Sequence, residues 1–327
     1  MAYYSCRWIE YGLNLLHNSL KFCCVVHING KGFPHICYFN GKNFPIDFIL
    51  SRRDSLRNAN NRERGYSPCR GCYALEKREW ENSNEKPYFK HFSVNNFLLC
   101  NLRCNYCYTL DERYKILPQY AYALFPFFKH MIESGYLYSD ASMDWGGGEP
   151  TLLQDFDKVA GLFIENGFKQ HIFTNATIYS EFIEQGLRNN TISIQASVDS
   201  GTRETYKRIK GKNLFDDVWH NLARYAKTGG HVIAKYIVKN DNADINDVTG
   251  FVRHCSLHSI PEITLTLDNN EVIKEIVTDS TLSAAVQLIR EARYLGIPAN
   301  PNYEMIGEKY SAVIRRRLED TNTISAV

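Results

Sequence analysis

The sequence predicts an α/β protein with a TIM-like partial (β/α)6 barrel and a small cysteine-rich α+β module before it. Strand-like and helix-like segments alternate from about residue 90 onward, and this alternation is typical of βαβ units around a parallel sheet. Residues 1–90 are instead interrupted by glycine and proline. Six of the ten cysteines lie in residues 1–72, and only one lies beyond residue 107.

The expected elements divide the chain into three parts. A cysteine-rich module is expected at residues 1–88, the barrel at 89–300 and a helical tail at 301–327. Strands are expected at 91–97, 141–146, 170–174, 191–198, 231–238 and 262–267, and helices near 118–135, 152–166, 180–189, 214–228, 244–257 and 278–296. In such sheets the functional site lies at the carboxyl ends of the strands.

Composition narrows the class of protein. The chain has 327 residues, 44% hydrophobic and 23% charged, as in an ordinary soluble globular protein. A net charge of +2 gives no support for a nucleic-acid partner, and no nucleic-acid-binding motif is present. No run of 18 apolar residues indicates a membrane span. Without a signal-peptide core, ten cysteines indicate metal ligation in a reducing, oxygen-poor cytoplasm.

Three cysteines lie within eight residues of one another. Cys100, Cys104 and Cys107 have the spacing C-x3-C-x2-C, which differs from ferredoxin and zinc-finger spacings. Three thiolates can hold one face of a [4Fe–4S] cluster, which normally takes four. One iron would then be open to another ligand, and an open position is where a metal centre does chemistry. The alternatives are a three-cysteine zinc loop and a set of buried thiols.

A glycine-rich turn follows the strand expected at 141–146. It reads Gly-Gly-Gly-Glu-Pro over residues 146–150. Glycines after a strand let a ligand approach the backbone closely. A carboxylate at this point, here Glu149, can accept hydrogen bonds from a bound ammonium group.

Further polar residues lie in or at the ends of later strands. Asn175 follows the strand at 170–174 and could bind a ligand or cap a turn. Asp199 could face a ligand or cap the helix after it. Lys235 lies within the strand 231–238, and alternation alone leaves open whether it points into the barrel or outward.

Two motifs resemble those of the radical S-adenosylmethionine (SAM) superfamily. They are the cysteine stretch, with Tyr106 before its last cysteine, and the turn at 147–150. Residues 147–150 are similar to the family's GGEP motif, and the resemblance covers roughly residues 90–270. It implies that the amine and carboxylate of SAM chelate the open iron. Reductive cleavage then gives methionine and a 5′-deoxyadenosyl radical, which abstracts a hydrogen atom from the substrate.

The resemblance also implies which residues hold SAM. The turn supplies contacts to the SAM amine, and Ser197 with a basic residue shortly after it holds the carboxylate. That basic residue is Arg208 or Lys210, and Arg208 is favoured. The residues expected to bind the cofactor are Gly147, Gly148, Glu149, Asn175, Ser197, Arg208 and Tyr106.

The cysteines before the barrel predict a second metal centre. Cys69 and Cys72 form a C-x2-C pair, and the segment that begins at Cys6 resembles the opening of a SPASM/Twitch auxiliary-cluster module. In relatives such modules follow the barrel rather than precede it. We expect an auxiliary [4Fe–4S] cluster on Cys6, Cys23, Cys69 and Cys72, with Cys24 able to replace Cys23. A four-cysteine zinc site and unligated buried cysteines are the alternatives. Cys37 and Cys255 are expected in the core.

The resemblance implies an oxidoreductase-type enzyme that needs a reductase such as flavodoxin or ferredoxin. A second cluster can take an electron from a substrate radical, so we expect oxidative modification of a peptide or protein side chain. A dehydrogenase or epimerase of a sugar or small metabolite is the alternative. RNA modification has no support from the charge, and an iron–sulfur protein without activity conflicts with the open cysteine loop.

Overall fold

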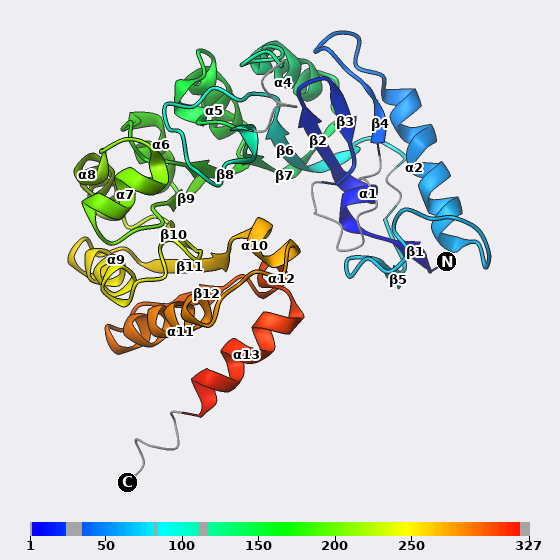
Figure 1. Ribbon diagram of the computed structural model, residues 1–327. Coiled ribbons are helices and arrows are strands. Elements are labelled where there is room, and N and C mark those ends of the chain that lie inside the picture. Colours follow the sequence, from blue (N-terminus) through cyan, green and yellow to red (C-terminus); the bar gives the residue numbers. More distant parts are fainter. Residues whose placement is uncertain (1, 24–34, 82–83, 111–116, 321–327) are drawn as a thin grey trace. The chain divides into compact units, whose positions relative to one another are not determined.

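The chain consists of two compact units (Figure 1). Unit 1 comprises residues 1–100 and 112–172, and unit 2 comprises 101–111 and 173–327. The structure, a computed structural model, describes residues 2–23, 35–81, 84–110 and 117–320. Each unit is described by itself.

Unit 1 is built on a mostly parallel sheet. Strands β7, β6 and β2 are neighbours in parallel, β8 begins beside β7, and β3 and β4 follow β2 in antiparallel order. The strands are β2 (Gly12–Leu16), β3 (Ser19–Lys21), β4 (His35–Tyr38), β6 (Phe89–Asn95), β7 (Leu137–Trp145) and β8 (Lys169–Thr174). A separate antiparallel pair joins β1 (Tyr3–Ser5) to β5 (Glu76–Arg78). The helices are α1 (Arg7–Tyr11), α2 (Ile46–Asn61), α4 (Leu124–Glu133) and α5 (Phe156–Glu165), with the short turn η2 (Pro150–Leu152).

The two faces of the unit 1 sheet differ in polarity. In β6, Phe92 and Val94 are buried, and Phe92 packs against Phe128 of α4 with 5.4 Å between ring centroids. Phe128 in turn contacts Phe163 of α5 at 4.9 Å. The alternating residues of β6 are polar and point to the opposite face, as strand geometry requires. Helices α4 and α5 therefore cover the apolar face.

The cysteine-rich segment contributes strands to this sheet. Residues 12–16 of β2 pair in parallel with residues 91–95 of β6. The compact units therefore divide the chain differently from the expected domains 1–88, 89–300 and 301–327. The reason is the backbone pairing, which makes β2 the direct neighbour of the first expected barrel strand.

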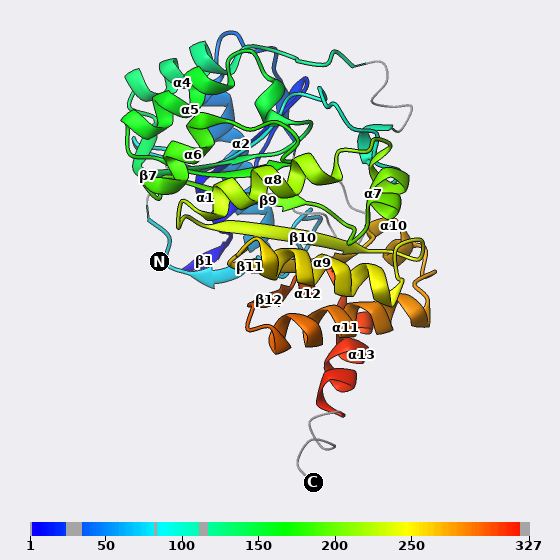
Figure 2. The same cartoon turned by 90° about the vertical axis from the view of Figure 1, so that its left-hand side faces the viewer.

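Unit 2 repeats strand and helix four times. Its strands run in parallel in the order β12–β11–β10–β9. They are β9 (Ile192–Ser197), β10 (Val232–Val238), β11 (Glu262–Leu267) and β12 (Ala299–Pro301). The helices are α6 (Glu181–Arg188), α7 (Arg203–Lys210), α8 (Phe215–Ala226), α9 (Ile245–Leu257), α10 (Asn269–Ile273), α11 (Asp279–Tyr294), α12 (Tyr303–Ile306) and α13 (Glu308–Glu319), with the turn η1 (Tyr108–Leu110). Helices α9 and α11 lie side by side along β10 and β11 (Figure 2).

Side-chain caps start several of these helices. The Thr202 hydroxyl accepts a hydrogen bond from the Thr205 N–H at the start of α7. Asp244 accepts from the N–H groups of Asn246 and Asp247 at the start of α9. Such caps satisfy backbone donors that have no partner within the helix. Helix α7 ends at Gly211, whose φ of 73° is left-handed and favours glycine.

The sequence located most elements closely, and α4 is the main exception. A helix was expected from residue 118, but α4 begins at Leu124. Residues 119–121 instead bond to the backbone of residues 96–98, through Leu98 N–H to Gln119 O at 2.7 Å and Ala121 N–H to Asn96 O at 3.0 Å. Asp155 also accepts from the Leu124 N–H at 2.9 Å, so a residue distant in sequence fixes the start of the helix.

The described part of the chain contains no helix that is both long and apolar enough to cross a membrane.

Changing Phe128 to Ala should destabilise the fold strongly. Its side chain is fully buried between the sheet and α5, and removal of a buried Phe costs about 3–5 kcal/mol. Phe48 is 50% exposed, and its Ala variant is the matched control. Urea unfolding followed by circular dichroism measures both. Equal unfolding midpoints for the two variants would contradict the packing described for α4.

Candidate functional site

The three clustered cysteines are half-buried and are not joined by disulfides. Cys100 belongs to unit 1, whereas Cys104 and Cys107 belong to unit 2. The Cys107 N–H donates to Cys104 O at 3.0 Å, which forms a tight turn between the two. Burial raises the pKa of Cys104, and the nearby Lys210 ammonium partly opposes this rise. Partly accessible thiols at this spacing fit the donor set that an iron–sulfur cluster needs.

The end of helix α7 holds the second half of this cysteine stretch. Arg103 N–H donates to Lys210 O at 3.0 Å, and Asn105 N–H donates to Ile209 O at 2.9 Å. Gly211 lies against the same segment, and a Cβ atom there would meet Arg103 at 3.1 Å. The backbone around Cys104 is therefore fixed by the last residues of α7.

A buried hydrogen-bonded triad lies at the same place. The Lys210 ammonium is 2.8 Å from the Tyr106 hydroxyl and 2.5 Å from Asp199 Oδ2. The Tyr106 hydroxyl also donates to Asp199 Oδ2, and burial raises the pKa of Tyr106 well above its ordinary value. Asp199 Oδ1 accepts from the Ile237 N–H at 2.7 Å. Asp199 therefore does not cap the following helix, because Thr202 fills that position.

The glycine-rich turn lies against the segment just before Cys100. Gly148 N–H donates to Phe97 O at 3.1 Å, and Glu149 N–H donates to Leu99 O at 2.7 Å. A Cβ atom on Gly148 would lie 2.2 Å from Leu99 O. Gly147 has a φ of +87°, which favours glycine. The sequence suggested close approach by a ligand, and the structure shows that the chain's own backbone also requires these glycines.

Glu149 is buried at the end of this turn, with 1% of its surface exposed. Its Oε1 atom accepts from the Thr151 hydroxyl at 2.8 Å and from the Thr151 N–H at 3.3 Å. The carboxylate therefore caps the turn η2 through one oxygen. Its binding of the SAM amine stays a prediction.

The side chain of Asn175 caps a turn, which was one of the two roles expected for it; the other was ligand binding. Its Oδ1 accepts from the Thr177 N–H at 3.0 Å and from the Thr177 hydroxyl at 2.7 Å. Its Nδ2 donates to Asn101 Oδ1 at 2.8 Å. Asn175 thus contacts a residue that lies between the first two clustered cysteines in sequence.

The residues expected to hold the SAM carboxylate differ in exposure. Ser197 is half-buried at the end of β9, in register with Lys235. Arg208 is exposed and donates to Asp241 O at 2.6 Å. Lys210, the other basic residue considered, is 1% exposed within the triad. Burial lowers the pKa of Lys235, and Asp199 partly opposes this.

Three of the four cysteines expected at the auxiliary site influence one another electrostatically. The pKa of Cys69 is raised to about 12, mainly by burial and in smaller part by Cys6 and Cys72. Burial raises the pKa of Cys6 to about 11, while the Ile9 and Trp8 N–H groups lower it. Cys23 is buried close to Lys21, and Cys24 lies outside the described residues.

Within residues 2–23, 35–81, 84–110 and 117–320, no three His, Cys, Asp or Glu side chains converge closely enough to hold a metal ion. The ligand sets for both metal centres therefore stay predictions.

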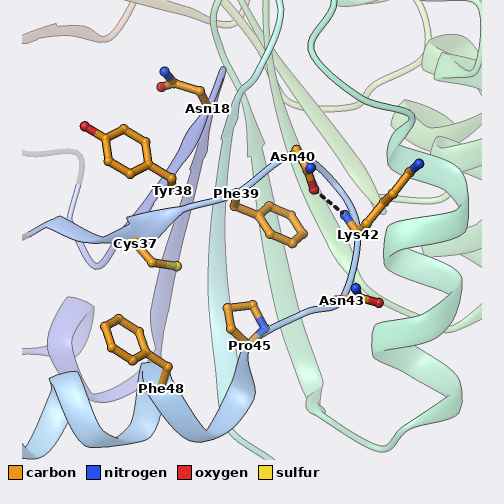
Figure 3. A pocket seen from close by; sticks show the side chains of 9 residues that line it. All are labelled: Asn18, Cys37, Tyr38, Phe39, Asn40, Lys42, Asn43, Pro45 and Phe48. Carbon is orange, nitrogen blue, oxygen red and sulfur yellow. Dashed lines mark hydrogen bonds between the residues drawn. The ribbon is translucent and has the colours of Figure 1, made fainter.

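The two remaining cysteines behave differently. Cys255 is fully buried, as expected for a core residue. Cys37 is half-buried and lines a pocket of about 620 Å³ in unit 1, so its placement in the core was wrong. Figure 3 shows this pocket, with Tyr38 and Phe48 at its wall. Cys37 reaches the pocket because it lies on β4, the last strand in the order of this sheet.

The face of the unit 1 sheet opposite α4 and α5 carries polar residues that the sequence analysis missed. His91 Nδ1 lies 3.0 Å from the Ser142 hydroxyl, and Asp144 stands opposite Ser93 in register. Burial raises the pKa of Asp144 to about 6, and Arg7 partly opposes this rise. The alternating polar residues at 91, 93 and 95 were the available signal. A row of this kind could contact a polar ligand.

Comparison with known proteins identifies the family. Residues 97–248 match the model of the radical SAM superfamily, and the parallel strand–helix repeats match its TIM-like partial barrel. Residues 97–248 of the chain therefore match a radical SAM domain, and this match implies a [4Fe–4S] cluster and SAM as cofactors.

The matches to curated relatives cover only part of each relative's length. GTP 3′,8-cyclase of Haemophilus influenzae (strain 86-028NP) is 28% identical over 47% of this chain and 47% of its own. Fe-coproporphyrin III synthase of Methanosarcina barkeri is 24% identical over 50% of this chain and 40% of its own. The chain thus spans about half the length of the relatives it matches, or less.

Two solved structures share the fold. SuiB of Streptococcus suis, bound to the precursor peptide SuiA, has a TM-score of 0.50 with 13% identity over 80% of this chain and 55% of SuiB. Native anSMEcpe with bound AdoMet has a TM-score of 0.50 with 16% identity over 65% of this chain and 64% of its own. At these identities the likeness shows the fold alone.

Changing Asp144 to Asn should stabilise the chain in a pH-dependent way. The folded pKa of about 6 exceeds the ordinary value of 3.8, so the folded chain binds more protons between these values. The free energy of unfolding contributed by Asp144 then falls as the pH rises through this window. Because one pKa unit corresponds to about 1.4 kcal/mol, the variant should gain on the order of 2–3 kcal/mol above pH 6.

Urea unfolding of the variant and the unchanged chain at several pH values, from below 4 to above 7, measures this gain. Asp140, exposed on the same strand, provides the matched Asn control. A stability gain that does not change with pH would contradict the burial described for Asp144.

Proposed function

We propose that the chain is a radical SAM enzyme whose cluster is held by Cys100, Cys104 and Cys107. The single observation that carries this proposal is the C-x3-C-x2-C stretch of cysteines inside the matched segment 97–248. When bound, the cluster supplies the electron for reductive cleavage of SAM, and the resulting 5′-deoxyadenosyl radical abstracts a hydrogen atom from the substrate.

The chain's own residues would bind and orient SAM. The turn at Gly147 and Gly148 offers backbone groups, and the carboxylate of Glu149 would accept from the SAM ammonium. Ser197 and Arg208 would hold the SAM carboxylate, with the exposed Arg208 turning from Asp241 O to do so. Asn175 and Tyr106 would line the same site. The role of each residue rests on its match to the family motif.

The buried cysteines of unit 1 would hold an auxiliary [4Fe–4S] cluster. Cys72 raises the pKa of Cys6, and both of these residues raise the pKa of Cys69, which supports a shared site. Cys23 would be the fourth ligand, with Cys24 as its alternative. Four ligands would close this cluster, so that it would accept or pass on an electron rather than bind SAM. A zinc ion held by the same thiolates is the competing occupant.

The reaction we favour is oxidative modification of a peptide or protein side chain. An auxiliary cluster could take the electron left on the substrate after hydrogen abstraction, which would give a net oxidation. The fold shared with SuiB, which was solved with a precursor peptide, supports a peptide substrate. A flavodoxin or ferredoxin in the cytoplasm would supply the first electron.

A small-molecule substrate is the second candidate. Several matched relatives are named GTP 3′,8-cyclase, and the polar row of His91, Ser142 and Asp144 could contact a sugar or a similar metabolite. The reaction would then be a dehydrogenation or an epimerisation. Turnover of a peptide encoded beside this gene would support the first candidate, and turnover of a sugar would support the second.

Changing Cys104 to Ala should abolish reductive SAM cleavage, because the cluster loses one of its three thiolates. Formation of 5′-deoxyadenosine with dithionite after anaerobic reconstitution measures this. Cys37→Ala is the matched control, since Cys37 lies outside both predicted ligand sets, and it should cleave SAM normally. Undiminished cleavage by the Cys104 variant would refute the proposed cluster site.

Changing Cys69 and Cys72 together to Ala should remove about four irons per chain while sparing SAM cleavage, because a cubane cluster contains four. Iron, acid-labile sulfide and zinc are measured after reconstitution, again with Cys37→Ala as the control. Loss of zinc instead of iron would establish a zinc site. An unchanged metal content would exclude a metal centre at these cysteines.

A further inference from the structure

The pair Asp199–Lys210 is an ion pair sealed within unit 2. The two side chains are 0% and 2% exposed, and their charged atoms are 2.5 Å apart. Removing two charges from water is costly, and a buried pair can often be replaced by apolar residues without loss of stability. Stability alone therefore gives little reason for charges at this place.

Both charges are directed at the cysteine stretch. Each hydrogen bonds to the hydroxyl of Tyr106, the residue before Cys107. The backbone of Lys210 also binds Arg103, the residue before Cys104. The pair is thus attached to the chain on both sides of Cys104, and its second point of attachment directly precedes Cys107.

The electrostatic influence of the pair reaches the sulfur of Cys104. Lys210 and Asp199 are both close enough to interact electrostatically with this sulfur, and their charges have opposite signs. Water screens such interactions weakly here, because both side chains are buried.

We propose that Lys210 and Asp199 set, in opposite directions, how readily the cluster on Cys100, Cys104 and Cys107 accepts an electron. This inference rests on the proposed function, since it requires that cluster. Reduction adds one negative charge to the cluster, and the electron comes from an external reductant such as dithionite or a flavodoxin. A nearby ammonium stabilises the added charge and a nearby carboxylate opposes it. Neither side chain gains or loses an electron.

Two single variants test the signs. Lys210→Met should make the cluster harder to reduce and move its midpoint potential to a more negative value. Asp199→Asn should move it to a more positive value. A tenfold change in the one-electron equilibrium corresponds to about 59 mV, and we expect shifts of this order. The double variant lacks both charges and should return close to the unchanged protein.

The measurement is a redox titration of the anaerobically reconstituted full chain, followed by electron paramagnetic resonance. The signal that changes when SAM is added identifies the proposed cluster and separates it from an auxiliary one. Arg203 at the start of α7 forms an exposed pair with Asp216 at the start of α8, and the two side chains are 61% and 67% exposed. Arg203→Met and Asp216→Asn are the matched controls and should leave the potential unchanged.

Opposite shifts of the two single variants would support the inference, because a purely structural role cannot produce them. Shifts of the same sign, or none, in variants that load iron would overturn it. If one single variant fails to fold, the other single variant is compared with the unchanged protein and with the double variant. A midpoint potential that does not shift in the direction set by the removed charge would also overturn the inference. An unchanged protein without a SAM-responsive cluster would instead refute the proposed function.

Discussion

Backbone hydrogen bonding to the cysteine stretch is the constraint on which the site depends. In unit 1, the Glu149 N–H binds Leu99 O and so ties the glycine-rich turn to the residue before Cys100. In unit 2, Lys210 O and Ile209 O bind the N–H groups on either side of Cys104. These hydrogen bonds join backbone atoms only, so they do not depend on the rotamers of the side chains. Each unit therefore fixes its own part of the stretch, and the loop can present thiols without disulfides or regular secondary structure.

Local patterns predicted the fold well because they arise from local physics. The expected strand at 262–267 coincides with β11, since alternating burial and β-branched residues specify a strand within a few positions. Partners distant in sequence caused the failures. Asp155 and the backbone of residues 96–98 set the start of α4. Asp199 binds Lys210 instead of capping a helix, and Cys37 lies on a strand that leaves it at a pocket. No short window of sequence contains these contacts.

The site could be predicted in part for the same reason. The cysteine spacing and the glycine turn are contiguous motifs, and the family match covers both. The residues that would distinguish substrates come from separate strands, such as His91 on β6 and Asp144 on β7. Matched relatives with names as different as GTP 3′,8-cyclase and Fe-coproporphyrin III synthase share the domain. The domain thus defines how a reaction begins, whereas side chains such as these would define its substrate.

The parallel pairing of β2 with β6 has a consequence for how this chain can be divided. The cysteine-rich segment is not an appendage that could be cut off or moved to another protein as a unit. A chain shortened to begin at residue 89 would leave the N–H and C=O groups of β6 that bond β2 without partners. An exposed strand edge of this kind promotes association between copies. The segment that contains β2 should therefore be kept when the matched domain is prepared in solution.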